Sequence, residues 1–509
     1  MSLSDSVTAT VAVLRRRPAD ILPWYLLGAA IPAIVRVVPF LAIVVGFIYL
    51  EVTGRLAVIR DELAGMDTEP PDPNASPEAF DEWVSGFEPV FDQVFTLGMS
   101  ALIVVTLIVT VLVSVFLAST VAAGQLTACA SRLRNDRGLT AGIAGARRYW
   151  LRFLGLYVLE FLLWMAALLT IGIGTALVAG IAVMVTGSPL LAAGFAVVAA
   201  LIAVVVLAAV RALFAFAPVA VVVDDATVFG SLSNAVGFIR SRPVGAGFYY
   251  VIAVGTMIAI SVISGALVLV NVMAFPSLVT ALLVFPALDL LKTALYTEHR
   301  NRLTPPVMPE RSLRNQFTTG ARRGWSEMTS FVRATLGTHA IVVALALASF
   351  WVGWAVAGPF AGPLETSISA RLEGHIPPAA ALEFFGNNWM VAITTALSGV
   401  VLVLPAVASL LFNGVFMGVF ARTEVEPLEL LAFVLPHGVF EIPAILIATA
   451  LGIQLGLAGW RTYQGRATRA DLADALERAF WVLIGIGILL AVAGFIEGFV
   501  SPYYFRLFL

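Results

Sequence analysis

Two ionisable residues stand four positions apart in an otherwise apolar stretch near the end of the sequence. His437 and Glu441 belong to the string PHGVFEIPA, so one helical turn would place both side chains on one face. A charged side chain at mid-bilayer costs about 2.5–3.5 kcal/mol on insertion scales, so such residues need a partner or a wet cavity. Pro436, Gly438 and Pro443 surround the pair and predict a broken helix, which a membrane tolerates only within protein or beside water.

Asn413 and Glu497 complete a predicted intramembrane polar cluster with His437 and Glu441. In a hydrogen-bonded network, His437 or Asn413 would bond the carbonyls freed at the breaks, and Asn413 or backbone donors would hold Glu441. A proton- or ion-handling site at a broken helix is a second hypothesis. A metal site would need a third and a fourth ligand; Glu497 and Asn413 are the candidates, but no spacing demands it. We favour the network, and we assign no catalytic residue, no metal and no cofactor.

A second set of charges lies in the predicted spans of the N-terminal half. Arg36 and Glu160 are each surrounded by apolar residues, and Arg211 directly follows a long apolar run. An intramembrane ion pair between Arg36 and Glu160, or between Glu160 and Arg211, would explain their presence. The simplest role of such a pair is to lock the spans together.

The composition predicts the fold class. Hydrophobic residues make up 60% of the 509 residues and charged residues 12%, which is typical of an all-α polytopic integral membrane protein. Charge-free runs recur along the chain and predict about 11 membrane segments, one of them a re-entrant or broken hairpin. The lone Cys129 excludes an internal disulfide and a multi-cysteine metal site. The sequence has no phosphate-binding loop and no basic domain, so we expect no nucleic acid partner.

Loop charges predict the topology. Glu51 to Asp92 is strongly acidic and should be external, whereas the arginine-rich segments around Arg147 and Arg322 should be cytoplasmic. The chain then starts in the cytoplasm and ends outside, in the plasma membrane. For the two ends of the chain to lie on opposite sides, either 389–420 or 430–459 must enter the membrane and return to the same side. The acidic residues between these two pieces favour an external loop, which makes 389–420 the broken hairpin.

Three segments share one pattern, in which acids come first, apolar residues follow at helical spacing and arginine ends the segment. We interpret them as amphipathic elbow helices on the inner leaflet, with charges oriented as the helix dipole favours. They are Asp136–Arg152, Asp225–Arg242 and Glu310–Arg333.

Several strings of the C-terminal part resemble the stage II sporulation protein M family. They are Asn413-Gly414, the PHG-x-x-E-x-P string from Pro436, FIEGFVSP from Phe495, and Asn387-Asn388-Trp389. The resemblance covers roughly residues 314–509. Residues 1–303 more weakly resemble membrane domains associated with glycerophosphodiester phosphodiesterases, whose catalytic domain is absent from this sequence. A proline-rich linker near Pro305 therefore separates a predicted six-span domain, 1–303, from a stage II sporulation protein M-like domain, 304–509.

The resemblance implies a non-enzymatic membrane subunit or scaffold. In sporulating bacteria, the family is a membrane component of the engulfment machinery and associates with a peptidoglycan-degrading protein and a membrane-anchored protein. We therefore expect partners among envelope or membrane proteins, besides the lipid bilayer. The alternative is a transporter or lipid-handling permease that uses a polar site at the broken helices, formed by Asn413, His437 and Glu441.

Overall fold

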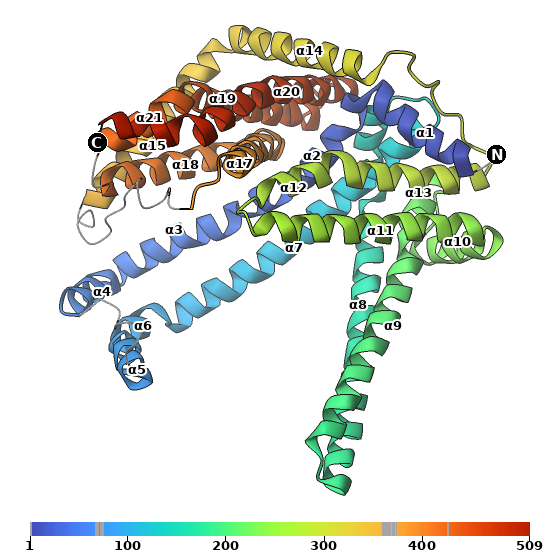
Figure 1. Cartoon of the computed structure of the whole chain (residues 1–509), viewed down its shortest axis with the longest axis horizontal. Coiled ribbons are helices and arrows are strands. Elements are labelled where there is room, and N and C mark those ends of the chain that lie inside the picture. The colour runs from blue at the N-terminus through green and yellow to red at the C-terminus, as the bar shows by residue number, and fades with distance from the viewer. Residues whose placement is uncertain are drawn as a thin grey trace. The chain divides into compact units, whose positions relative to one another are not determined.

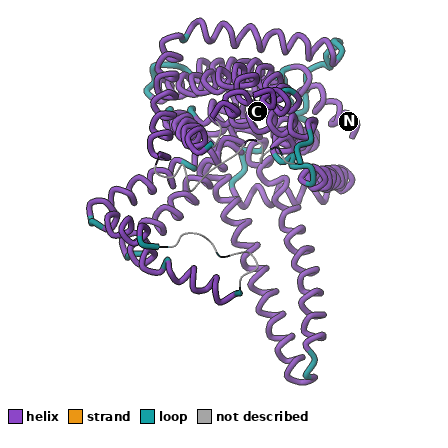
Figure 2. The backbone as a smooth tube through the Cα atoms, turned by 60° about the vertical axis from the view of Figure 1, so that its left-hand side comes forward, coloured by secondary structure: helices purple, strands orange, loops and turns teal. Residues whose placement is uncertain are grey.

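A computed structural model describes residues 3–66, 71, 76–358, 368, 372, 374–424 and 427–508. Every regular element described is a helix, and short loops connect most of them (Figure 2). Ten of the described helical segments are long and apolar enough to cross a membrane. The protein is therefore an all-α polytopic membrane protein, as its composition predicts.

The N-terminal half contains the following elements (Figure 1): α1 (Leu3–Arg16), η1 (Pro18–Asp20), α2 (Leu22–Val35), α3 (Val37–Val52), α4 (Arg55–Ala64), α5 (Pro77–Gly86), α6 (Glu88–Val94), α7 (Leu97–Arg132), α8 (Gly138–Thr186), α9 (Pro189–Val223), α10 (Val228–Ser241), α11 (Pro243–Val268), α12 (Ala274–Val279), the π-helical turn η2 (Thr280–Val284) and α13 (Phe285–His299).

The C-terminal half contains α14 (Leu313–Ala334), α15 (Leu336–Ala357), α17 (Pro377–Ser398), α18 (Leu404–Thr423), α19 (Pro427–Tyr463), α20 (Arg469–Phe499), α21 (Ser501–Tyr504) and η4 (Phe505–Phe508).

Contacts divide the chain into two compact units. The smaller comprises Pro32–Val115, in which α3 approaches α7 at Gly46, where an added Cβ would lie 3.1 Å from Met99. The larger comprises Met1–Ile31 and Phe116–Leu509, so residues 116–303 and 304–509 lie within one unit. The sequence boundary at residue 303 stays a prediction about domain organisation.

Helix α20 is the central helix of the C-terminal half. It packs against α14, α17 and α19, and many of its residues are buried. Glycines permit these approaches: Gly485 faces the backbone of Gly324 in α14, and Gly487 faces the indole of Trp389 in α17. The Trp389 indole also donates a hydrogen bond to the Leu483 carbonyl, at 3.0 Å. Small residues thus set the helix spacing around α20.

The stretch 389–420 is divided between two helices. Helix α17 ends at Ser398 and α18 begins at Leu404, and Leu402 and Val403 between them have positive φ angles of 63° and 68°. Gly399 permits the break to pack on α19, because a Cβ there would lie 2.1 Å from the Gly452 carbonyl oxygen. The other candidate, 430–459, lies within the continuous helix α19. The structure thus has its break in the piece that the loop charges favour.

Two of the three predicted elbow helices are separate elements. Thr227 caps α10 and Ser312 caps α14, each by accepting a hydrogen bond from a backbone N–H of the first turn. The remaining prediction, that Asp136–Arg152 forms a separate helix, is wrong. Residues from Gly138 onward form the first part of the 49-residue helix α8. No proline or glycine pair interrupts the helix between the arginines and the apolar run that follows.

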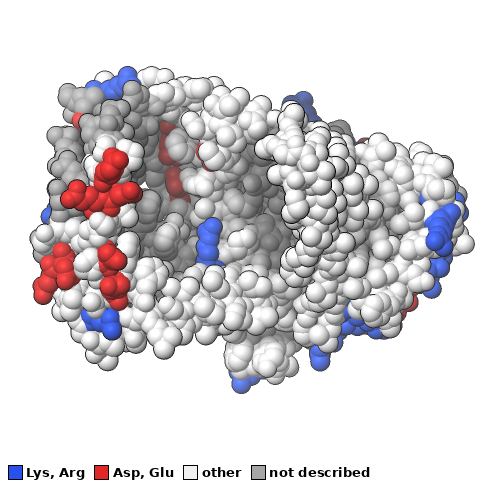
Figure 3. Space-filling view, turned by 90° about the horizontal axis from the view of Figure 1, so that it is seen from below, with Lys and Arg blue, Asp and Glu red and all other residues white. Residues whose placement is uncertain are grey.

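Helices α8 and α9 run side by side as a hairpin (Figure 1). No residue between 161 and 213 is buried, and residues 161–210 carry no Asp, Glu, Lys or Arg. In the view of Figure 3, most of the visible surface belongs to residues other than Asp, Glu, Lys and Arg. A long apolar surface of this kind belongs in contact with lipid or with another membrane helix.

Candidate functional site

Helix α19 supplies two residues of the polar cluster. His437 and Glu441 are one turn apart and lie on the same face, as their spacing predicts. The prediction that the helix breaks around them is wrong, because α19 runs through both Pro436 and Pro443. Each proline removes one backbone hydrogen bond, but membrane helices tolerate prolines where neighbouring groups compensate for the freed carbonyls.

Helix α20 and the turn that follows it supply the facing residues. The Nε2 atom of His437 lies 4.0 Å from Oε1 of Glu497, and its Nδ1 atom lies 3.0 Å from the hydroxyl oxygen of Ser501. One ligand-type atom from each of His437, Glu441 and Glu497 lies within 4.8 Å of the others. The packing of α19 on α20 therefore joins residues 60 positions apart in the sequence into one site.

The site is buried and incompletely satisfied. His437 is 5% exposed and Glu497 is 9% exposed. The Oε2 atom of Glu497 is buried without a hydrogen-bond partner, and among the described residues no hydrogen bond reaches the carboxylate of the partly buried Glu441. A buried carboxyl group without a partner is costly, and buried charges are normally paired or coordinate a metal. The arrangement can hold a proton or a cation between the two carboxyl groups and the imidazole.

Asn413 does not take part in these contacts. It lies in the middle of α18, a continuous helix, and its side-chain amide donates a hydrogen bond to the Ser409 carbonyl one turn earlier, at 2.8 Å. The predicted break beside Asn413 is therefore also absent. The hypothesis that Asn413 holds Glu441 has no hydrogen bond to support it among the described residues.

The N-terminal charges are separated into two places. Glu160 is 8% exposed and forms an ion pair with Arg211, in which Nη1 lies 3.1 Å from Oε1. This pair connects α8 to α9, where the apolar hairpin leaves the core. Arg36 lies at the break between α2 and α3, in the smaller unit, with an exposed side chain. Of the two pairings that the sequence suggested, the described residues show the one between Glu160 and Arg211.

Ser501 is the site residue that the sequence interpretation missed. It stands four positions after Glu497. A helix that continued through both residues would place them on the same face, beside the cluster. Helix α20 ends at Phe499 and the short α21 begins at Ser501, so helical periodicity alone does not position its hydroxyl.

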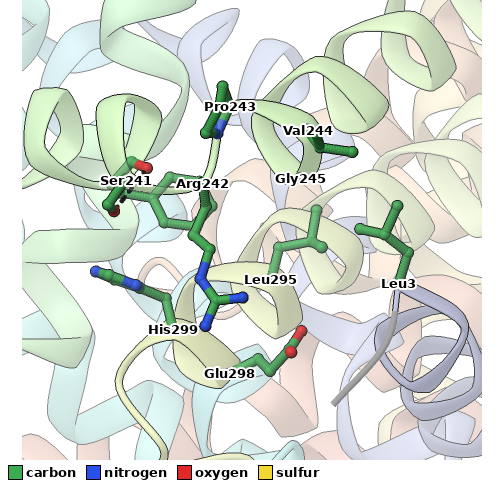
Figure 4. A pocket seen from close by; sticks show the side chains of 10 residues that line it. Leu3, Ser241, Arg242, Pro243, Val244, Gly245, Leu295, Glu298 and His299 are labelled. Atoms are coloured by element: carbon green, nitrogen blue, oxygen red, sulfur yellow. Dashed lines mark hydrogen bonds between the residues drawn. The ribbon is translucent and has the colours of Figure 1, made fainter.

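A separate cavity of about 330 Å³ lies where α1, α10, α11 and α13 meet (Figure 4). Arg242, Glu298 and His299 contribute its polar lining, and Ser6 of α1 donates a hydrogen bond to Glu298, at 2.9 Å. None of the residues of the predicted polar cluster lines this cavity. It is thus distinct from the site formed by α19 and α20.

Comparisons with known proteins match the part of the chain that contains the polar cluster to a protein family. The family model described as stage II sporulation protein M matches residues 341–502, a range that contains His437, Glu441, Glu497 and Ser501. An uncharacterized protein of Methanocaldococcus jannaschii is 34% identical over 125 residues, which cover 23% of this chain and 67% of the relative. No solved structure shows a significant match. From the helical membrane fold and these matches, we conclude that the chain belongs to the stage II sporulation protein M family through its C-terminal part.

Proposed function

We propose that the protein is a non-enzymatic subunit of a membrane protein complex, which binds another envelope protein through the α8–α9 hairpin. The observation that carries this proposal is the absence of any buried residue between 161 and 213. Two helices of span length thus leave the core beyond the ion pair between Glu160 and Arg211, where they pack against each other and bury no residue.

The surface chemistry of the hairpin supports a helical partner. A shallow groove of about 400 Å³ runs between α8 and α9, and small residues such as Gly172, Ala176, Ala199 and Ala203 line it. Lipid tails are as apolar as leucine, so helices associate in membranes by close packing at small residues. A Cβ added at Gly172 would meet nothing within 4 Å, which leaves room for a helix backbone. Because the groove carries no charge, its expected occupant is an apolar transmembrane helix of another protein.

The family assignment supports the same class of function, because the resemblance to this family implies a membrane subunit that assembles with envelope proteins. We further propose that the protein resides in the plasma membrane, with its N-terminus in the cytoplasm and its C-terminus outside. The arginines of the α13–α14 connection and of α14 support this orientation by the positive-inside rule.

A pull-down from the native host in mild detergent tests the proposal. The intact protein should retain a membrane protein partner, and Gly172→Leu, which fills the groove, should reduce its recovery at least tenfold. Gly174→Leu is the matched control, because Gly174 lies on the same helix, also has nothing within 4 Å and does not line the groove.

Two outcomes would contradict the proposal. One is equal recovery of the partner with both variants. The other is a solitary protein, or a complex made only of copies of this chain, that moves a solute across the membrane of a liposome. The latter result would favour the permease hypothesis.

A further inference from the structure

In the part of the chain that the structure describes, the cluster formed by His437, Glu441 and Glu497 has no lysine or arginine as a partner. Among the described residues, neither carboxyl group has an ion pair with lysine or arginine, and the contact between His437 and Glu497 is long, at 4.0 Å. Two other buried carboxyl groups do have partners, because Asp20 accepts two backbone N–H groups and Glu160 forms an ion pair with Arg211. The cluster is thus an exception that calls for a bound cation.

The donor set suits one class of cation. An imidazole nitrogen with two carboxylate oxygens is a typical set for zinc and related divalent transition metals, whereas magnesium and calcium prefer oxygen ligands alone. Zinc–ligand distances of about 2.0–2.2 Å place neighbouring ligand atoms of a tetrahedral site about 3.4 Å apart. The three ligand atoms lie within 4.8 Å of one another, so side-chain adjustments on the order of 1 Å would complete the geometry.

Ser501 provides the support that a metal-binding histidine needs. Histidine ligands commonly donate their second ring N–H to an oxygen, which fixes the tautomer and the orientation of the ring. When Nδ1 carries the proton and donates it to the Ser501 hydroxyl, 3.0 Å away, Nε2 is free to bind a metal on the side of Glu497, 4.0 Å away. The unpartnered Oε2 of the buried Glu497 is available as a ligand on the same side.

We propose that His437 Nε2 and the carboxylates of Glu441 and Glu497 bind one divalent transition-metal ion of the zinc class, with Ser501 orienting the imidazole. The ion joins α19 to the end of α20 and neutralises two buried carboxylates. This inference is independent of the proposed partner binding, which uses the opposite half of the chain. It revises the assignment of no metal that the sequence suggested.

Metal analysis of the purified protein tests the proposal. After chelation and reloading with zinc chloride in mild detergent, the intact protein should retain one zinc ion per chain. His437→Ala and Glu497→Gln should each reduce this occupancy at least tenfold. Matched controls are His339→Ala, at a histidine whose Nδ1 bonds its own helix, and Glu160→Gln, at a carboxylate paired with Arg211, and both should retain the ion.

Ser501→Ala keeps all three ligands and therefore tests the site even if a ligand variant fails to fold. It should weaken zinc affinity about 10- to 100-fold, the usual effect of losing such a support. Zinc should also raise the unfolding midpoint of the intact protein and not that of Glu497→Gln. The proposal is overturned if the intact protein retains no more zinc than His437→Ala, or if Ser501→Ala binds zinc as tightly as the intact protein.

Discussion

The carboxylate of Asp20 and the guanidinium group of Arg132 form an ion pair in the interior of the protein, with 3.4 Å between Oδ2 and Nε. Their side chains are only 4% and 3% exposed. The same carboxylate accepts the backbone N–H groups of Gly138 and Leu139, so Asp20 caps the first turn of α8. A single acidic residue thus connects the N-terminal segment to the ends of both α7 and α8.

Replacing Asp20 with alanine should destabilise the protein by about 3–5 kcal/mol, because Arg132 would remain as a buried charge without its partner. The free energy of unfolding in mild detergent measures the effect. Asp474→Ala is the control, because Asp474 forms a pair with Arg137 in which both side chains are substantially exposed, and it should cost less than about 1 kcal/mol. Similar losses of unfolding free energy for the two variants would show that the buried ion pair stabilises the protein no more than the exposed one.

Gly353 of α15 should tolerate no side chain. An added Cβ would lie 2.0 Å from the Val415 carbonyl oxygen of α18, and a backbone atom cannot move aside cheaply. We expect Gly353→Ala to cost about 1–3 kcal/mol of stability, the usual penalty of overpacking. Gly337→Ala, in the same helix with nothing within 4 Å, should be neutral or stabilising by up to about 1 kcal/mol. A neutral Gly353→Ala, measured by thermal unfolding, would refute the close packing of α15 on α18.

Asp225 should make stability dependent on pH in the acid range. Its hydrogen bond with Arg152, at 2.6 Å, followed by that with Arg148, lowers the pKa of its carboxyl group. A carboxyl group with a lowered folded-state pKa contributes stability above its unfolded pKa of about 3.9, and loses that contribution as pH falls through the lower folded value.

The matched variant for this test is Asp225→Asn, since asparagine also accepts the left-handed backbone found there, with φ of 54°. The stability difference between the intact protein and this variant should be constant near neutral pH and should shrink as the pH falls below about 4. The effect is modest because the Asp225 side chain is 47% exposed. A difference that persists unchanged to lower pH would exclude this ion pair as its source.

Cysteine labelling should reveal the predicted orientation in the membrane. Cys129 is fully buried, so a variant with Cys129→Ala provides a background for single cysteines at exposed positions. A membrane-impermeant maleimide applied to intact cells should label Asp81→Cys and Tyr503→Cys, whereas Arg322→Cys should react only after permeabilisation. Labelling of Asp81→Cys and Arg322→Cys from the same side would contradict the topology.

Composition and local patterns were sufficient to predict the membrane class and much of the local structure. Apolar runs predict spans because backbone groups in lipid must be satisfied within each helix, and this rule acts locally. The four-residue spacing of His437 and Glu441 places them on one face of any helix. Likewise, Thr468 and Asp471 form a capping box at the start of α20, and the bonds of such a box join residues only three positions apart in the sequence.

Only the tertiary structure decided which helices meet and how the break between α17 and α18 packs. Residues 389–420 and 430–459 look alike locally, and the break at Gly399 depends on its packing against Gly452 of a different helix. The meeting of His437 with Glu497 and Ser501 depends in the same way on the contact of α19 with α20. Such pairings arise from close packing at small residues far apart in the sequence, and periodicity within one helix carries no information about them.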